Sequence, residues 1–372
     1  MYCEMKKQII YLDCAATTPI TQPVLEAMTP YLTEYYGNPS SLYSLGTKSK
    51  TAIEKARKQI AEAINAEPNQ IFFTSGATES NNWVCSNFRR VMCSPYEHHS
   101  VLNHPNTNSV LNHPNTTQLS QYCSFKWNIQ DILPDLVSHM MVNNEIGTIY
   151  DIKGMAKICH ENHVLLGTDA TQAFSHIPID VKDLDVDFLS LSAHKFHGAK
   201  GVGILYIKEP DKFKPFIYGG GQEQHRRAGT ENVASIVGMG VASQLYNYSP
   251  ERDKRCKEIQ MKFYNAFSKM QDVHFNTDIN NSISTTLNVG FKGVESESLM
   301  LLLDMDGICV SAGSACNSGS LEPSHVLKAI NCPEEYIHQS IRLSWDDTLT
   351  DEEIEYTIES IKKNIKKVRG YI

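Results

Sequence analysis

The sequence predicts an α/β protein with two domains, and three observations favour this fold class. Between residues 70 and 207, strand-like runs alternate with helical runs, which is typical of a mostly parallel sheet covered by helices. From Pro250 onward the pattern changes and long helical stretches dominate. A chain of 372 residues is also too long for one simple hydrophobic core. We therefore expect a large domain over 14–250 and a smaller α+β domain made of 1–13 and 251–372.

The spacing of apolar residues predicts the individual elements. A helical period indicates helices, and short β-branched or aromatic runs indicate strands. The predicted helices are 21–36, 49–65, a helix that begins at Glu79, 152–162, 252–271, 296–305 and 351–368. The predicted strands are 70–74, 136–143, 164–168, 188–192, 203–207 and 283–289. Thr350 and Glu353 have the spacing of a capping box, which supports the start of the last helix.

Residues 100–116 contain a tandem duplication, because the segment that begins at Ser100 recurs from Ser109. Two copies are too few to build a solenoid. Proline and asparagine occur in both copies, so we expect this segment to form a loop.

Composition excludes several classes of protein. The net charge of −8, without a block of like charge, argues against binding to nucleic acid. No apolar run approaches the roughly 20 residues of a membrane span, and residues 1–10 lack the apolar core of a secretory signal. Ten cysteines without a CxxC pair predict free thiols in a reducing, cytoplasmic compartment. We expect no metal site, because the His-rich region 98–113 lacks spaced cysteines or carboxylates.

Two polar segments, 168–172 and 190–195, predict a site for pyridoxal phosphate (PLP). This cofactor needs a lysine amine for a Schiff base, a carboxylate that keeps its pyridinium nitrogen protonated, and hydroxyl and imidazole groups around its phosphate. The residues that supply these groups are Lys195, Asp169, Ser192 and His194. Either the lysine or the aspartate alone would more often be an ordinary surface or capping residue. Their combination favours the cofactor.

Further motifs are spread over almost the whole chain. In chain order, with the two segments above between the fifth and sixth, they are Tyr11–Pro19, Gly37–Ser41, Thr74–Ser80, Glu97–His98, Val142–Gly147, Gly219–Glu223, Arg227–Thr230, Ser311–Cys316, Leu321–Ser324 and Ser340–Arg342. With these motifs in this order, the chain resembles the cysteine desulfurases, PLP enzymes of the class-V aminotransferase family. The resemblance implies the PLP-dependent transferase fold type I, a large domain with a mostly parallel, seven-stranded type of sheet flanked by helices and a smaller α+β domain.

The resemblance also implies which residues hold the cofactor phosphate. Ala77 and Thr78 follow a glycine turn between a strand and a helix, where backbone N–H groups and the helix dipole favour an anion. Thr230 resembles the threonine that completes this phosphate cup from the neighbouring subunit. A homodimer is implied by that resemblance.

Other residues match the family's contacts to the cofactor ring and the substrate. His98 would stack on the pyridine face and move protons at the substrate. Asn144 and Gln172 would bond to the phenolic oxygen of PLP. Arg342 suits bidentate capture of an amino-acid carboxylate, with Asn38 as a second contact.

Cys316 is the residue that distinguishes a desulfurase from a transaminase. It lies in a stretch of small residues, about 311–322, that we expect to be mobile. A thiolate on such a loop can take sulfur from a substrate and present it to a partner. Cys309 lies in an apolar run instead, so we expect it to behave as a small core residue.

These residues together predict a cysteine desulfurase that converts L-cysteine to L-alanine and leaves a persulfide on Cys316. A sulfur-acceptor protein, an iron–sulfur scaffold or a sulfurtransferase, would then use this sulfur for iron–sulfur cluster or thio-cofactor synthesis. Two alternatives stay open at this point. One is another PLP reaction, selenocysteine lysis or transamination, and the other is a degenerate PLP fold kept as a binding protein.

Overall fold

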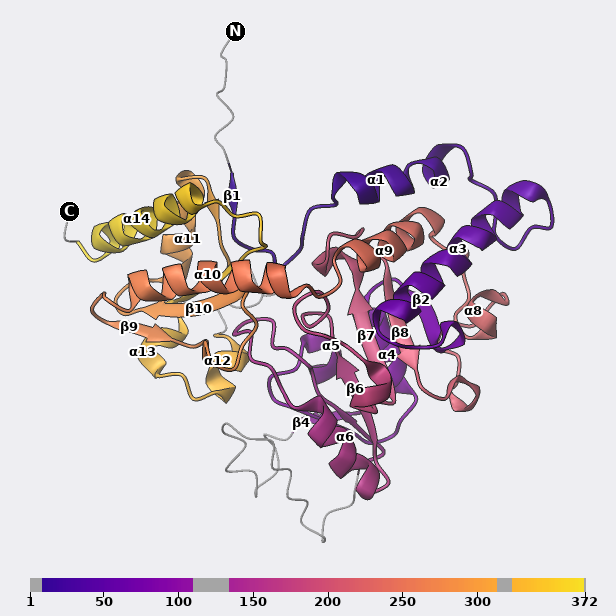
Figure 1. The fold of residues 1–372 in the computed structure, drawn as a ribbon. Helices are drawn as coiled ribbons and strands as arrows, with labels where there is room; N and C mark the ends of the chain where they lie inside the picture. Colours follow the sequence, from indigo (N-terminus) through magenta and orange to yellow (C-terminus); the bar gives the residue numbers. More distant parts are fainter. Residues whose placement is uncertain (1–8, 110–133, 313–322, 371–372) are drawn as a thin grey trace. The chain divides into compact units, whose positions relative to one another are not determined.

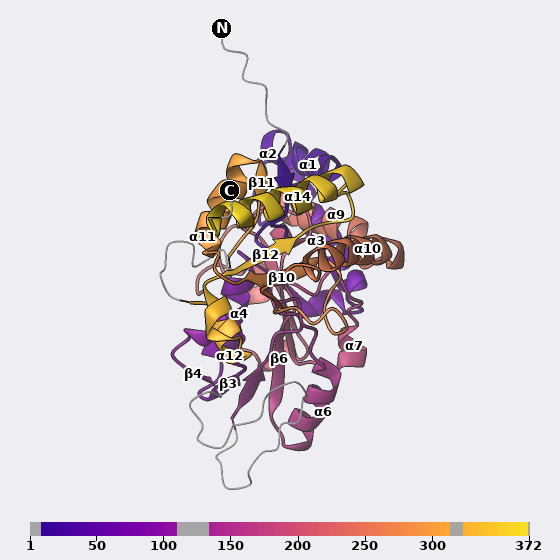
Figure 2. The ribbon, with the colours of Figure 1, turned by 90° about the vertical axis from the view of Figure 1, so that its left-hand side faces the viewer.

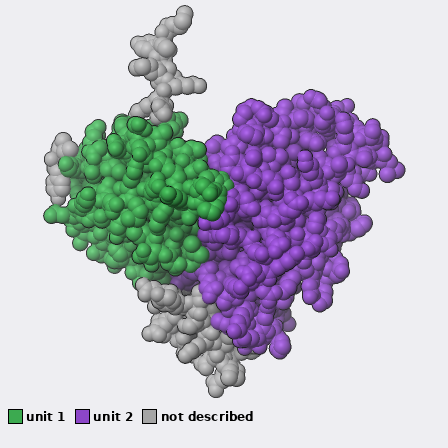
Figure 3. All heavy atoms as spheres, in the orientation of Figure 1, with its two compact units in different colours: residues 1–17, 143–149, 249–372 green, residues 18–142, 150–248 purple. Residues whose placement is uncertain are grey.

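The computed structural model describes residues 9–109, 134–312 and 323–370 (Figure 1). The chain divides into two compact units, which are coloured separately in Figure 3. Unit 1 comprises residues 1–17, 143–149 and 249–372, and unit 2 comprises residues 18–142 and 150–248. Because 143–149 belongs to unit 1, the chain passes between the units several times.

Unit 2 is built around a mixed sheet with the strand order β2-β8-β7-β6-β5-β3-β4. Its strands are β2 (Ile71–Thr74), β3 (Val91–Cys93), β4 (Thr107–Ser109), β5 (Leu136–Ser138), β6 (Leu165–Asp169), β7 (Phe188–Ser192) and β8 (Gly203–Ile207). The run from β7 to β4 is parallel, whereas β8 is antiparallel to both of its neighbours. Every residue of β2, β7 and β8 is buried, as expected for strands covered on both faces. The predicted fold class, a mostly parallel sheet flanked by helices, is confirmed.

Helices cover this sheet (Figure 1). They are α1 (Gln22–Met28), α2 (Pro30–Thr33), α3 (Ser44–Ala63), α4 (Ala77–Ser86), α5 (His99–Leu102), α6 (Ile152–Glu161), α7 (Val181–Leu184), α8 (Gln222–His225) and α9 (Val233–Leu245), with short 3-10 turns η1 (Pro68–Gln70), η3 (Ala193–Lys195) and η4 (Pro210–Lys212). Helix α9 packs against α3 and α1. A Cβ on Gly240 would lie 2.7 Å from the Cα of Ala56, so only glycine permits this close approach.

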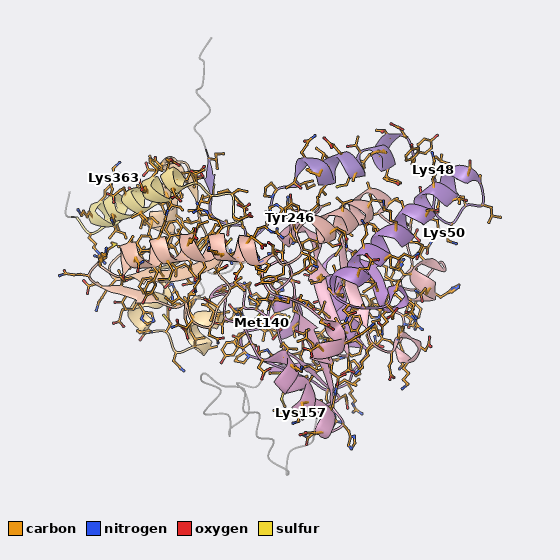
Figure 4. The ribbon with its side chains drawn as sticks, viewed as in Figure 1. Lys48, Lys50, Met140, Lys157, Tyr246 and Lys363 are labelled. Carbon is orange, nitrogen blue, oxygen red and sulfur yellow. The ribbon has the colours of Figure 1, made fainter. Side chains whose placement is uncertain are left out.

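Three sequence predictions for unit 2 need correction. The predicted helix 21–36 is two helices, because Pro30 has no N–H to continue the α1 ladder and begins α2 instead. The predicted strand 136–143 ends at Ser138, and the N–H of Met140 (labelled in Figure 4) bonds to a side chain, the carboxylate of Glu97. The first copy of the duplication is not all loop, since it contains residues 100–102 of α5 and, at Thr107, the first residue of β4, the edge strand that pairs with β3. Most of the second copy lies outside the described residues.

Unit 1 contains the antiparallel sheet β12-β10-β9 and the parallel pair β1-β11. Its elements are β1 (Ile10–Tyr11), α10 (Pro250–Phe267), β9 (Val273–Phe275), β10 (Thr286–Phe291), α11 (Ser296–Met305), β11 (Ile308–Cys309), α12 (His325–Ala329), α13 (Glu334–Ile337), β12 (Ser340–Ser344) and α14 (Asp351–Val368). Residues of α10, α11 and α14 share one apolar core with β10 and β12 (Figure 2). The capping box at Thr350 and Glu353 is confirmed, with both of its hydrogen bonds present.

The segment 143–149 is tied to unit 1 by hydrogen bonds to the region just before and within β10. The carbonyl of Gly147 accepts the N–H of Ile283 at 2.9 Å, and the carbonyl of Glu145 accepts the Asn288 amide at 3.1 Å. This placement puts Asn144 in unit 1, whereas Asp169 and Lys195 lie in unit 2. No helix in the described ranges is long and apolar enough to cross a membrane.

Candidate active site

The predicted cofactor residues Asp169, Ser192 and Lys195 lie at the carboxyl ends of two neighbouring parallel strands. Asp169 is the last residue of β6 and is paired in register with Ser190 of β7. Strand β7 ends at Ser192, and the η3 turn that follows it contains Lys195. In open α/β sheets this edge is where ligands bind. The strand order therefore brings the predicted acid, hydroxyl and lysine to one edge of the sheet.

Asp169 is a buried carboxylate that two donors hold in one orientation. Its Oδ2 accepts the side-chain amide of Asn81 at 2.8 Å, and its Oδ1 accepts the N–H of Thr171 at 2.9 Å. Asp169 and the nearby Gln172 are each 7 % exposed. A buried, fixed carboxylate of this kind suits the role of partner to a protonated ring nitrogen.

The turn from β2 into α4 forms a cradle that fits a phosphate. Gly76 has a φ of 151°, which favours glycine, and a Cβ built on it would lie 3.5 Å from the hydroxyl oxygen of Ser192. A Cβ on Gly203 would lie 2.6 Å from the Cα of Gly76, so this turn is pressed against the start of β8. Ala77 and Thr78 are the first residues of α4, where the helix dipole and backbone N–H groups favour an anion. The donors here are those that a phosphate requires.

Glu223 anchors the strand that leads into this cradle. Its two carboxylate oxygens accept hydrogen bonds from Arg57 at 2.8 and 2.9 Å, and one of them also accepts the N–H of Phe73 in β2. Both charged side chains are almost fully buried. Glu223, the last residue of the Gly219–Glu223 motif, therefore helps to hold β2 in place.

His194 and Lys195 are half-buried in the η3 turn. The carbonyl of His194 accepts both the N–H and the hydroxyl of Thr18, at 2.8 and 3.0 Å, which fixes the turn. Burial, together with the nearby charges of Lys195 and Lys200, lowers the pKa of His194 to about 4. His194 is therefore neutral at physiological pH and can donate one N–H to a phosphate oxygen.

His98 and its neighbour Glu97 lie at the start of α5. His98 is half-buried, and its Nδ1 accepts the N–H of Ser100 at 3.1 Å. Glu97 is fully buried and accepts the N–H of Met140 at 2.6 Å and the hydroxyl of Ser94 at 2.9 Å. Burial raises the pKa of Glu97 to about 8.

Thr230 and Asn38 are exposed residues of unit 2. Thr230 lies shortly before α9. The side chain of Asn38 accepts the N–H of Ser40 at 2.9 Å and so closes a local turn.

Arg342 lies in the middle of β12 in unit 1 and is only 1 % exposed. Its Nη1 donates to the carbonyl of Asn144 and its Nη2 to Oδ1 of Asp13, both at 2.7 Å. The Nε of Arg342 has no partner among the described residues. The predicted substrate residue is thus already paired with a carboxylate of its own unit.

Cys316 lies outside the described residues, but both ends of its segment are anchored in unit 1. Ser311 exchanges two backbone hydrogen bonds with Arg342, at 3.2 and 2.6 Å. Ser324 caps α12, and its hydroxyl donates to the carboxylate of Glu145 at 2.5 Å. Cys309, in contrast, is half-buried, and its pKa is raised by burial and by Asp304 and Asp13, so its thiolate is disfavoured.

Sequence patterns did not single out Asn81, which bonds to Asp169, Ser100 and Ser190. The signal that could have found Asn81 is its position one turn after Ala77 and one turn before the buried Cys85. A polar residue on a helix face that is otherwise buried needs hydrogen-bond partners. The described residues contain no group of three or more His, Cys, Asp or Glu that could hold a metal ion.

Comparison with known proteins gives the same assignment over nearly the whole chain. The family model described as aminotransferase class-V matches residues 10–357. A curated relative from Methanosarcina thermophila, named cysteine desulfurase IscS, is 42 % identical and covers 98 % of this chain and 94 % of its own length.

Two solved structures extend this assignment to the fold. A NifS-like protein superposes with a TM-score of 0.83 at 32 % identity, covering 96 % of this chain and 99 % of its own. SspA, solved in complex with cysteine, superposes with a TM-score of 0.76 at 31 % identity, covering 92 % of this chain and 100 % of its own. The chain is therefore a member of the class-V aminotransferase family, a family of PLP enzymes, within its cysteine desulfurase group.

Proposed function

We propose that this protein binds PLP and removes the sulfur of L-cysteine, releasing L-alanine and forming a persulfide on Cys316. The observation that carries the proposal is the edge formed by β6 and β7. There a buried, doubly hydrogen-bonded Asp169 lies beside the strand that leads to Ser192 and Lys195. The family membership and a relative solved with cysteine support the same substrate.

Each proposed cofactor contact uses a group whose surroundings suit it. Lys195 is the point of covalent attachment. Asp169 would keep the ring nitrogen protonated, and His98 would stack on the ring. The phenolic oxygen is bound by Asn144 and Gln172. The phosphate contacts are Ala77, Thr78, Ser192, His194 and, from a second copy of the chain, Thr230.

When bound, PLP withdraws electrons from the α-carbon of an amino acid. The protein residues then act on the substrate. Arg342 and Asn38 bind its carboxylate, which orients the thiol, and His98 moves protons at its carbon and sulfur. The thiolate of Cys316 attacks the substrate sulfur, so that an S–S bond forms as the Cβ–S bond breaks. The electron pair stays with Cβ, which takes up a proton to give alanine.

The anchoring of 311–324 supports Cys316 as this nucleophile. The segment begins at Ser311, which is bonded to the proposed substrate residue Arg342. It ends at Ser324, which is bonded to Glu145, the neighbour of Asn144. Both attachments lie in unit 1 beside residues that we assign to substrate and cofactor.

The persulfide is passed to a sulfur-acceptor protein, either an iron–sulfur scaffold or a sulfurtransferase. The protein acts as a homodimer, which the exposure of Thr230 supports, because a residue that serves a second copy must be accessible to it. It acts in the cytoplasm. The cysteines of the described ranges are all free thiols, which suits a reducing compartment.

A product assay tests this function against the other PLP reactions. The purified protein is incubated with L-cysteine and a thiol reductant, without any keto acid, and alanine and sulfide are both measured. We expect equal amounts of the two, because each turnover releases one alanine and one sulfur atom. Alanine that forms only when pyruvate is added as amino acceptor would indicate an aminotransferase. Activity with selenocysteine but none with cysteine would indicate a selenocysteine lyase.

A further inference from the structure

Asn81 is a buried asparagine of α4 whose side-chain amide is fully engaged in hydrogen bonds. Its Nδ2 donates to Oδ2 of Asp169 at 2.8 Å and to Oγ of Ser100 at 2.9 Å, while its Oδ1 accepts the hydroxyl of Ser190 at 2.7 Å. The residue is 6 % exposed. Because a carboxylate accepts and a hydroxyl donates here, the amide has only one orientation that satisfies all three partners.

The same network reaches His98 through Ser100. Since Oγ of Ser100 accepts from Asn81, its own proton is available to Nδ1 of His98, which lies 2.9 Å away. The backbone N–H of Ser100 also points at Nδ1, at 3.1 Å. A ring nitrogen that accepts hydrogen bonds carries no proton, so neutral His98 bears its proton on Nε2.

We propose that Asn81 is a positioning residue that links Asp169 and His98 into one hydrogen-bonded unit. One branch holds the Asp169 carboxylate, and the other, through Ser100, holds the Nε2–H tautomer of His98. This inference rests on the proposed function in one respect, since it takes Asp169 and His98 to be the residues that contact PLP. We assign Asn81 no contact of its own with substrate or cofactor, since its hydrogen-bond partners in the described ranges are Asp169, Ser100 and Ser190.

Variants separate the two branches. Asn81→Ala removes both, and Ser100→Ala removes the hydroxyl on the His98 branch while leaving the Asn81–Asp169 contact. Asn82→Ala is the matched control, because Asn82 is the adjacent asparagine and, among the described residues, its side chain bonds only to the backbone carbonyls of Thr78 and Ser100. Ser190→Ala removes the hydrogen bond to the Asn81 side-chain oxygen. It leaves in place the two hydrogen bonds that Asn81 donates, to Asp169 and to Ser100.

Two readouts that do not depend on turnover test the proposal. The first is the dissociation constant of PLP, titrated by absorbance into the full-length apoprotein. Asn81→Ala should weaken it about tenfold, the effect of losing one hydrogen bond to a charged group, whereas Ser100→Ala and Asn82→Ala should match the wild type within about twofold. The second readout is the ring-nitrogen NMR spectrum of the histidines, with the His98 signals assigned by His98→Gln. Wild type and Asn82→Ala should show the Nε2–H form. Asn81→Ala and Ser100→Ala should show a larger share of the Nδ1–H form, because they lose or free the Ser100 hydroxyl and leave the backbone N–H of Ser100 as the remaining fixed donor to Nδ1.

Several results would overturn the inference. If Asn81→Ala binds PLP with wild-type affinity and leaves the His98 tautomer unchanged, the proposal is wrong. A lower melting temperature as the sole effect would mean that Asn81 has a purely structural role. If Asn81→Ala does not fold, Ser190→Ala replaces it and should weaken PLP binding and mix the tautomers to a smaller extent. Wild-type behaviour of Ser190→Ala together with an unchanged tautomer in Ser100→Ala would then refute the proposal. Failure of the wild-type protein itself to bind PLP would instead refute the proposed function.

Discussion

Arg342 and Asp13 form an ion pair within unit 1, in which Nη2 of the guanidinium lies 2.7 Å from Oδ1 of the carboxylate. The arginine side chain is 1 % exposed and the aspartate side chain 18 %. Since a guanidinium has five N–H groups, Arg342 keeps Nε and one hydrogen on each Nη for a second carboxylate. The pair therefore holds the arginine in place without using all of its donors.

Arg342→Ala should raise the Michaelis constant for cysteine about ten- to a hundredfold while PLP stays bound, because a bidentate contact to a carboxylate is lost. It should also lower the free energy of unfolding by about 1–3 kcal/mol, since Asp13 loses its partner. Saturation kinetics and calorimetry measure the two effects.

Asp13→Asn is the matched control for that prediction. It removes the charge of the pair but leaves the guanidinium, so we expect lower stability without a rise in the Michaelis constant. If Asp13→Asn raised the constant as much as Arg342→Ala did, the ion pair would account for the effect and Arg342 would not be a substrate contact.

Lys195→Ala should abolish the visible absorbance of lysine-bound PLP and leave a folded protein, because a half-buried lysine in a short turn contributes little to the core. Lys200→Ala is the control, since Lys200 is an exposed lysine of the same loop and should keep the absorbance band. An unchanged band in Lys195→Ala would mean that another lysine carries the cofactor.

The raised pKa of Glu97 predicts that the stability of the protein depends on pH. Its pKa is raised to about 8 by burial, so the folded protein holds this proton more tightly than the unfolded chain does. The resulting stabilisation is fully present below the unfolded pKa of about 4.5 and is lost as the pH rises through about 8. The variant Glu97→Gln keeps a side-chain oxygen that can accept hydrogen bonds from the Ser94 hydroxyl and the Met140 N–H. Its amide has no titratable proton in this pH range.

Melting temperatures of wild type and Glu97→Gln between pH 5 and pH 8.5 test this effect. The melting temperatures of the two proteins should be most similar at pH 5. Toward pH 8 the wild type should lose more free energy of unfolding than Glu97→Gln, by on the order of 1–3 kcal/mol. Parallel pH profiles of the two proteins would show that Glu97 does not titrate in this range.

Features that depend on residues close together in the sequence could be predicted from it. The strands at β6 and β7, the glycine turn at Gly76 and the capping box at Thr350 are of this kind, because local spacing and turn chemistry define them. Their positions in the structure follow directly from those patterns.

Long-range contacts could not be predicted in this way. Asp13 and Arg342 are separated by 329 positions, and nothing in either motif indicates that they form an ion pair. The placement of 143–149 in unit 1 depends on hydrogen bonds to Asn281 and Ile283, far along the chain. Asn81 was missed because its partners Ser100, Asp169 and Ser190 come from three separate elements.

Alanine formation by Cys316→Ser is the measurement that tests the central claim most directly. Serine keeps the size and polarity of the side chain but cannot accept the sulfur, so PLP should stay bound while alanine production falls by at least about a hundredfold. Cys309→Ser serves as the control and should retain activity, because the Cys309 thiolate is disfavoured by burial. In the wild type, peptide mass mapping after incubation with L-cysteine should find the persulfide on Cys316. Alanine production by Cys316→Ser at the wild-type rate, or a persulfide on Cys309, would contradict the assignment.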